Sequence, residues 1–243
     1  METLVPADPA AEQPVVEEPQ VCLPEHCFYA FDTLFCELTN KKPLPPKFPD
    51  EKYALFVTWN TRSSRHGRAP RLRGCIGNFD PMPLHEGLAE YALISAFRDS
   101  RFRKIEEWEL ETLECDVSLL TDFEDATSYL DWTIGVHGIY ISFPHPTSSA
   151  ASEAPSPLSS STSVPTLHAY KRTYTATYLP QIAPEQGWDK IETVDSAIRK
   201  AGWNGRITED VRRSIKLRRY QSRKCTVSWE EFVQWRKANG GKI

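Results

Sequence analysis

The hexapeptide Leu-Arg-Gly-Cys-Ile-Gly, residues 72–77, brings a thiol, a guanidinium and two glycines into one short segment. On an extended strand Arg73 and Cys75 lie on one face, because side chains alternate with a period of two. A guanidinium at that spacing can lower the pKa of a thiol and populate the reactive thiolate. Gly74 and Gly77 permit a ligand or a bulge close to the backbone. The segment therefore predicts a nucleophilic or redox thiol, or an anion pocket around Arg73.

A structural role for Cys75 is the competing interpretation, and the residues alone favour it. Cysteine is among the most buried residue types and fits where neighbouring chain leaves little room. A catalytic thiol also needs a base within hydrogen-bond reach. His85 and His137 are the candidates, and nothing in the sequence places either beside Cys75. His137 lies in a strand-like run between glycines, which favours a core histidine over a base.

Residues 98–104, which follow a predicted helix, include Arg101, a candidate second cation for the anion pocket around Arg73. Basic residues there complement the partial negative charge of a helix C-terminus, which is a sufficient explanation. The alternative is an anion-binding loop beside Arg73. The candidate catalytic residue is thus Cys75, and the candidate ligand-binding residues are Leu72, Arg73, Gly74, Cys75, Ile76, Gly77, Arg101 and His137.

Two basic segments raise the question of nucleic acid. Residues 62–73 hold five arginines and no acid, and residues 199–224 hold ten bases against two acids. If both segments lie on one face of the protein, they could follow a phosphate backbone, and Trp203 or Tyr220 could stack on bases. Outside the acidic N-terminal segment, however, the chain is close to neutral, unlike most nucleic-acid-binding domains. A solvated face or a protein-docking surface is the favoured interpretation.

Metal and nucleotide chemistry are poorly supported. Cys22, His26, Cys27 and Cys36 lack the paired spacing of a zinc site and share a helical stripe with phenylalanines, which favours core packing. No P-loop, G-x-G-x-x-G, H-E-x-x-H or G-x-S-x-G pattern occurs. We expect no metal and no cofactor.

The elements that must position these residues mix strands and helices without regular β-α-β alternation, which predicts an α+β fold with antiparallel sheet. The strand-like segments 53–59 and 71–79 form a hairpin, and Asp80–Pro83 ends its second strand. Residues 214–228 are ambiguous between strand and helix, and Ser228 with Glu231 fits a capping box that opens a helix. Further helices are expected at 27–38, 84–97 and 187–203, and further strands at 113–120, 135–143 and 170–180.

Two segments read as disordered. Residues 1–20 carry five acids, four prolines and no aromatic residue, so they offer too little apolar surface to offset chain entropy. Residues 144–169, rich in Ser, Pro, Thr and Ala, read as an insertion at a hairpin tip. Residues 21–243 then form the folded domain.

The compartment is expected to be the cytoplasm or nucleus. The six cysteines are scattered, the N-terminus lacks a basic region followed by an apolar run, and no stretch approaches 18 apolar residues. We expect no membrane partner.

The hexapeptide and several longer stretches together resemble the AMMECR family, in its eukaryotic form. The resemblance covers roughly residues 21–235, and it implies an intracellular α+β protein of two closely associated subdomains. Prokaryotic relatives are linked to Memo-like and radical-SAM proteins, which implies a protein partner in an enzyme system. This chain departs from the family pattern in its acidic tail and in the 144–169 insertion. The stretches are 72–77, 91–102, 117–139, 175–196 and 214–228.

Three functions follow as hypotheses. The leading one is a regulatory or enzyme-assisting adaptor with a functional cleft at the hexapeptide strand. The second is an enzyme that uses Cys75 as thiolate nucleophile or redox group, activated by Arg73. The third is nucleic-acid binding through segments 62–73 and 199–224.

Overall fold

The computed structural model describes residues 21–62, 69–145 and 173–243, so the acidic tail and nearly all of the predicted insertion lie outside it. Within these ranges one six-stranded sheet runs in the order β2-β1-β3-β6-β4-β5, and every neighbouring pair is antiparallel. The predicted α+β class is confirmed. In chain order the elements are α1 (Pro24–Thr39), β1 (Lys52–Thr61), β2 (Arg71–Pro83), α2 (Leu84–Phe97), the 3-10 helix η1 (Glu107–Thr112), β3 (Leu113–Asp125), β4 (Gly138–Pro144), β5 (Thr173–Tyr178), α3 (Ile182–Gln186), α4 (Lys190–Lys200), α5 (Glu209–Arg213), β6 (Lys216–Ser228) and α6 (Trp229–Ala238).

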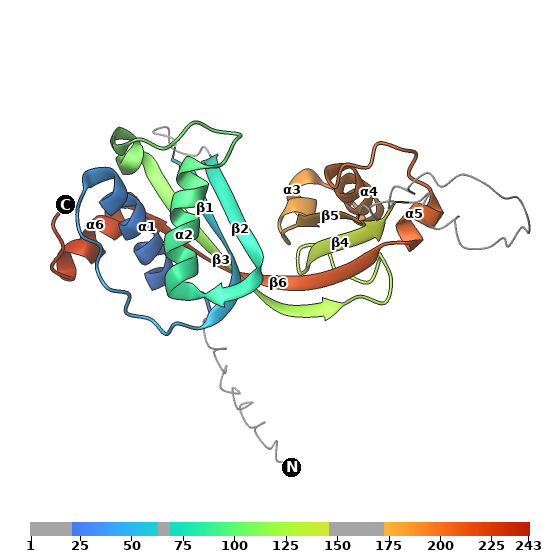
Figure 1. Cartoon of the computed structure of the whole chain (residues 1–243), viewed down its shortest axis with the longest axis horizontal. Coiled ribbons are helices and arrows are strands. Elements are labelled where there is room, and N and C mark those ends of the chain that lie inside the picture. Colours follow the sequence, from blue (N-terminus) through green and yellow to red (C-terminus); the bar gives the residue numbers. More distant parts are fainter. Residues whose placement is uncertain (1–20, 63–68, 146–172) are drawn as a thin grey trace, which may run out of the picture.

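Two lobes share this sheet (Figure 1). The first lobe contains α1, α2 and α6 packed on β1, β2 and β3, and the second contains β4 and β5 with α3, α4 and α5. Strands β3 and β6 are 13 residues long and form most of the connection between the lobes. Each lobe has its own hydrophobic core, as expected for two closely associated subdomains.

The core of the first lobe is aromatic. Phe31 of α1 stacks on Phe232 of α6 at a centroid distance of 4.7 Å and meets Trp59 of β1 edge-on. The indole of Trp59 is fully buried and donates its N–H to the carbonyl of Ala92 in α2, so its polar group is satisfied. These contacts fix α1 and α2 on one face of β1.

A third, smaller cluster shows that the sheet is strongly curled. Phe79 of β2 lies 5.7 Å from the ring of Tyr220 in β6 and 5.6 Å from that of Tyr140 in β4. In sheet order these strands are three and four places from β2. Such contacts between distant strands require the sheet to close toward its own face, so β2 and β4 approach across a concave surface.

The structure extends or revises several predicted elements. The hairpin of β1 and β2 is confirmed, but β2 continues through Asp80–Pro83 as an edge strand, where proline is tolerated. The ambiguous segment 214–228 is mostly strand β6. The capping box is confirmed, because the Ser228 hydroxyl accepts from the backbone N–H of Glu231.

Candidate functional site

Cys75 lies on the edge strand β2, opposite Thr58 of β1. The Thr58 hydroxyl donates to the Cys75 sulfur over 3.0 Å. The backbone of Cys75 points away from β1: its N–H donates to a carboxylate oxygen of Asp99 at 2.9 Å, and its carbonyl accepts from Arg101 at 3.2 Å. Two side chains from the loop after α2 therefore take the place of a neighbouring strand.

The Asp99–Arg101 pair is preorganised for this role. Arg101 donates to both oxygens of the Asp99 carboxylate, at 2.9 and 2.6 Å, and these bonds hold the pKa of Asp99 at about 2. Asp99 is buried, whereas the side chain of Arg101 is 55% exposed. An unpaired strand edge is a template for association with another chain, and this pair closes the edge at Cys75.

Arg73 does not share a face with Cys75 as predicted. The β1–β2 register slips between Trp59 and Asn60, and Arg73 is the residue left without a partner, so the alternation breaks there. The four hydrogen bonds of the Arg73 guanidinium within the described chain go to Glu109 and to the carbonyls of Arg103 and Lys104. Arg73 is buried and paired with Glu109, so it is a packing residue rather than an activator of the thiol.

Both glycines of the hexapeptide are required by packing. A Cβ on Gly74 would lie 2.2 Å from the carbonyl oxygen of Ser95 in α2, and one on Gly77 would lie 2.2 Å from the carbonyl oxygen of Leu55. The predicted close approach is therefore confirmed, but neighbouring backbone makes it rather than a ligand.

The thiol of Cys75 is half-buried and predominantly protonated at neutral pH. Burial raises its pKa, and the Thr58 hydrogen bond and the charge of Arg101 lower it by less. The geometry thus opposes thiolate formation, although two neighbours would stabilise a thiolate if one formed.

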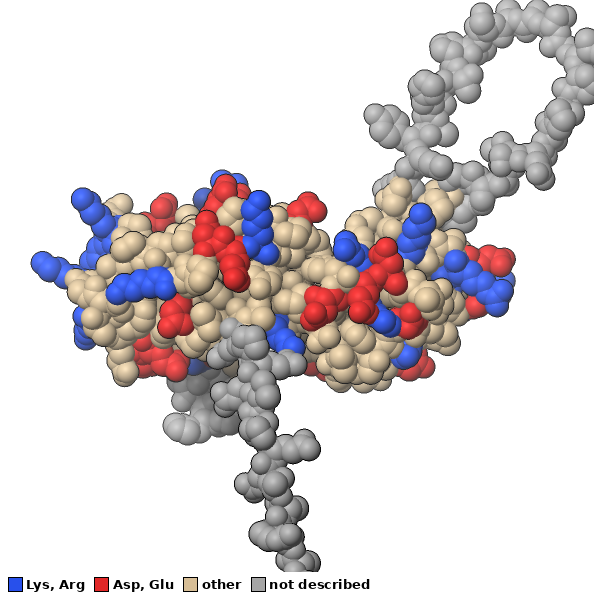
Figure 2. Space-filling model, turned by 90° about the horizontal axis from the view of Figure 1, so that it is seen from below, with Lys and Arg blue, Asp and Glu red and all other residues tan. Residues whose placement is uncertain are grey.

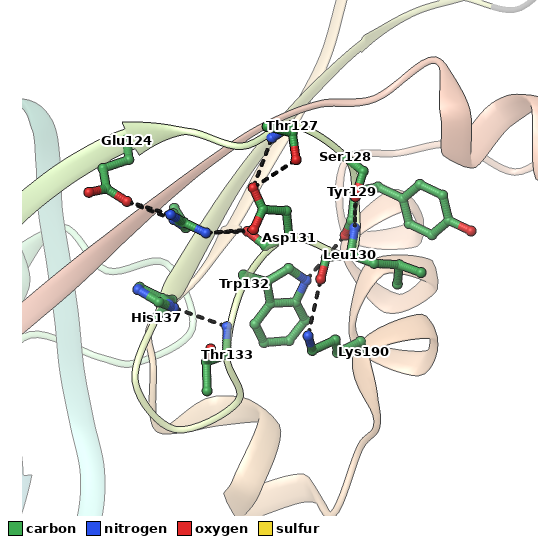
Figure 3. A network of polar contacts seen from close by, with 11 residues as sticks. Glu124, Thr127, Ser128, Tyr129, Leu130, Asp131, Trp132, Thr133, His137 and Lys190 are labelled. Carbon is green, nitrogen blue, oxygen red and sulfur yellow. Dashed lines mark hydrogen bonds and ion pairs between the residues drawn. The ribbon is translucent and has the colours of Figure 1, made fainter.

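Neither candidate base is hydrogen-bonded to Cys75. His85 stands at the start of α2, where its ring bonds the carbonyl of Phe48 at 2.9 Å. Asp99 follows the other end of this helix, which spans about 20 Å. His137 is half-buried in the turn before β4, where its Nδ1 accepts from the backbone N–H of Thr133 at 3.0 Å, as Figure 3 shows. It is a turn-closing histidine, not a core one.

Sequence reasoning missed a residue that comes from the second lobe, Lys200 at the end of α4. Its ammonium donates to the carbonyl of Thr177 at 2.8 Å and lies 4.5 Å from the ring centre of Tyr178 in β5. Lys200 is exposed to solvent, yet partial desolvation and the charge of Arg101 lower the pKa of its ammonium. Cys75 has a smaller effect, which raises this pKa. Figure 1 shows β2 facing α3 and β5 across the space between the lobes.

A buried carboxylate continues this polar surface across the sheet. Asp116 of β3 pairs with Thr58, accepts from Asn60 at 2.9 Å and from Thr226 at 2.7 Å, and forms an ion pair with Lys224 at 2.7 Å. Both of its carboxylate oxygens therefore have partners, and it lies next to Thr58, which bonds the Cys75 sulfur.

The turn that leads into β4 is held by a polar network (Figure 3). Asp131 accepts from the backbone and hydroxyl of Thr127 and pairs with Arg219 at 2.7 Å, and Arg219 also pairs with Glu124. Lys190 donates to the carbonyl of Leu130, which ties this turn to α4. The network positions α4, and with it Lys200, relative to the sheet.

Several arginines of the two basic segments are paired with acidic side chains in the described part of the chain. Arg62 pairs with Glu230, Arg212 with Asp195 and Arg219 with Glu124. On the face that Figure 2 shows, acidic and basic side chains are interspersed over both lobes. Tyr220 is fully buried, so the prediction that it stacks on bases is wrong, and Trp203 packs against the second core. Residues 63–68 of the first segment lie outside the described residues.

The N-terminal cysteines and His26 lie in the core of the first lobe, as predicted. Cys22, Cys27, Cys36 and His26 are all buried, and the thiol of Cys27 donates to the carbonyl of Cys225. Across the described residues, no group of three histidine, cysteine or acidic side chains is arranged to hold a metal ion. None of the helices in the same ranges is long and apolar enough to cross a membrane.

The protein is thus an α+β domain in which two lobes share one curled antiparallel sheet. The hexapeptide lies on an edge strand of that sheet. The chain belongs to the AMMECR1 family, whose model matches residues 27–225. An uncharacterized protein of Arabidopsis thaliana is 43% identical over 219 residues, which cover 90% of this chain and 91% of the relative. One of Schizosaccharomyces pombe is 34% identical over 215 residues, covering 86% and 94%. The crystal structure of an uncharacterized protein from Pyrococcus horikoshii has a TM-score of 0.60 at 23% identity, covers 83% of this chain and 89% of that one, and shows the shared fold.

Proposed function

We propose that this protein is an adaptor of the cytoplasm or nucleus that binds an acidic group of a protein partner in a cleft at the hexapeptide strand. The observation that carries the proposal is the position of Lys200. No carboxylate pairs with its ammonium in the described ranges, and the charge of Arg101 acts on it from the first lobe. An ammonium that has no carboxylate partner in the described chain, and on which a second positive charge acts, favours an anionic ligand.

The chemistry of this cleft suits binding better than covalent catalysis. The Cys75 thiol is desolvated, and its hydrogen bond comes from a hydroxyl rather than a base. The guanidinium of Arg101 offers one exposed edge, and its other contacts fix its orientation through Asp99. An enzyme that uses Cys75 remains the alternative, and it requires the ligand or partner to supply the base.

Quantitative affinity purification from cells tests the proposal. The Lys200→Gln variant removes the charge, and Cys75→Ser changes the cleft by one atom. The control is Lys237→Gln on α6, which loses the same charge in the other lobe. We expect the same proteins to be recovered several-fold less with Lys200→Gln and equally with Lys237→Gln.

Unchanged recovery with both cleft variants, at melting temperatures equal to that of the wild type, would exclude the cleft as the binding site. Recovery that depends on Cys75→Ser but not on Lys200→Gln would favour the thiol alternative instead.

A further inference from the structure

A cavity of about 750 Å³ lies in the second lobe, and none of its lining residues belongs to the hexapeptide or to the loop that follows α2. Its floor is formed by β4 and β6, and its walls are formed by residues 125–130 and by α5. This volume is within the range of small-molecule sites. Its polar and aromatic lining includes Tyr129, Tyr140, Ser142, Glu209, Lys216 and Arg218.

The floor of the cavity presents hydrogen-bond donors in two cross-strand pairs. Ser142 of β4 is opposite Lys216 of β6, and Tyr140 is opposite Arg218 in the same register. Directly opposite residues on antiparallel strands have neighbouring side chains on one face. An ammonium, a guanidinium and two hydroxyls therefore border the same space.

In the described part of the chain, one long ion pair is the single carboxylate contact of the two floor cations. Arg218 is 3.9 Å from Asp125, whose side chain is 94% exposed, and its guanidinium lies over the ring of Phe123. No carboxylate pairs with Lys216 in the part of the chain that the structure describes. Elsewhere in the same lobe the arrangement is different: Arg212 holds Asp195 through two hydrogen bonds of 2.8 and 2.7 Å.

The cavity wall contains two acidic residues, Asp125 and Glu209, and Glu209 is already paired with other residues of the wall. Glu209 accepts from the Tyr129 hydroxyl at 3.0 Å, and this hydrogen bond joins the two walls to each other. Glu209 also pairs with Arg213 at 3.1 Å. Tyr129 and Tyr140 supply ring surface, and Leu130, Ile215 and Leu217 add apolar lining. The cavity thus combines a positive floor, compensated only in part by Asp125, with aromatic and apolar sides.

We propose that this cavity binds a small ring-bearing molecule through a phosphate or carboxylate group that Lys216 and Arg218 hold. The ring lies against the tyrosines, and the anionic group lies on the floor beside Ser142. The site is separate from the cleft at the hexapeptide strand, and the two proposals stand or fail independently.

Titration calorimetry with the full chain tests this site, with inorganic phosphate, phenyl phosphate and benzoate as probes. Phenyl phosphate is expected to bind more tightly than inorganic phosphate, because only the ester reaches the apolar sides. Comparison with benzoate distinguishes a phosphate from a carboxylate as the preferred anion. Lys216→Gln and Arg218→Gln should each weaken binding about tenfold, the size of one lost charge-assisted contact.

The control variant is Arg206→Gln, which removes a charge from an exposed side chain of the same lobe outside the cavity. Its affinity should equal that of the wild type. Three results would overturn the proposal: no binding of any probe, equal binding of phenyl phosphate and inorganic phosphate, or an equal loss of affinity in Arg206→Gln.

Discussion

Arg73 donates to both carboxylate oxygens of Glu109, at 2.8 and 2.9 Å, and both side chains are about nine-tenths buried. The arginine of the hexapeptide therefore serves the fold. It joins the edge strand β2 to η1, 36 residues further along the chain, and it also bonds two carbonyls of the intervening loop.

Breaking this pair should strongly destabilise the protein. Arg73→Ala leaves the Glu109 carboxylate buried without its partner, so we expect the free energy of unfolding to fall by about 3–5 kcal/mol. Denaturant unfolding measures the change, and Arg103→Ala, which removes an exposed arginine of the same loop, should cost less than about 1 kcal/mol. A similar small loss for Arg73→Ala would show that the pair does not support the fold.

Gly74→Ala should destabilise the chain although it adds a single methyl group. The new Cβ would lie 2.2 Å from the Ser95 carbonyl, so β2 or α2 must move, at a cost of about 1–3 kcal/mol. Leu72→Ala, in the same hexapeptide, alters a side chain that is 40% exposed and should change stability by less than about 1 kcal/mol. Thermal unfolding of the two variants decides the point, and equal melting temperatures would contradict it.

The Cys75 thiol should be alkylated slowly at neutral pH. Because burial raises its pKa, its rate at pH 7 should be below that of cysteine in a short peptide and should continue to rise at pH values where the peptide has levelled off. Mass spectrometry of iodoacetamide-treated native protein gives the rate for this residue. Arg101→Gln removes a charge that lowers the pKa, so it should slow alkylation further. A rate at pH 7 above that of the peptide would instead support the thiolate enzyme.

His26 should make stability depend on pH on the acid side of neutrality. Burial lowers its pKa from 6.5 to about 4, so between these values the unfolded chain binds a proton that the folded chain does not. Stability is complete above about pH 6.5 and declines as pH falls toward 4, by about 2 kcal/mol at pH 5.

Unfolding free energies at pH 7 and pH 5 test this, with His26→Phe as the comparison. Phenylalanine keeps a ring against Phe48, which meets the His26 ring edge-on at 4.6 Å, but it does not titrate. An equal decline in both proteins would assign the pH dependence to other groups.

Local patterns in the sequence predicted much of the fold. The period-two strands, the helical stripe of α1 and the capping box at Ser228 depend on neighbours within a few residues, and all three are confirmed. The site was harder to predict. The bulge at Arg73 breaks the alternation on which the shared face depended. Gly74 indicated that a bulge was possible, but the local pattern does not say at which residue the register slips. Arg73 meets Glu109, and the charge of Arg101 acts on Lys200 of the other lobe, only because distant segments fold together.

Strands β3 and β6 belong to both lobes, so a boundary drawn between the lobes would cut two strands in the middle of their length. Neither half would then have a complete sheet on which to pack its helices. We therefore expect the two lobes to melt in one cooperative transition, and variants of either lobe to shift the same midpoint. Evolution or engineering can exchange loops on this protein, but it cannot exchange one lobe for another.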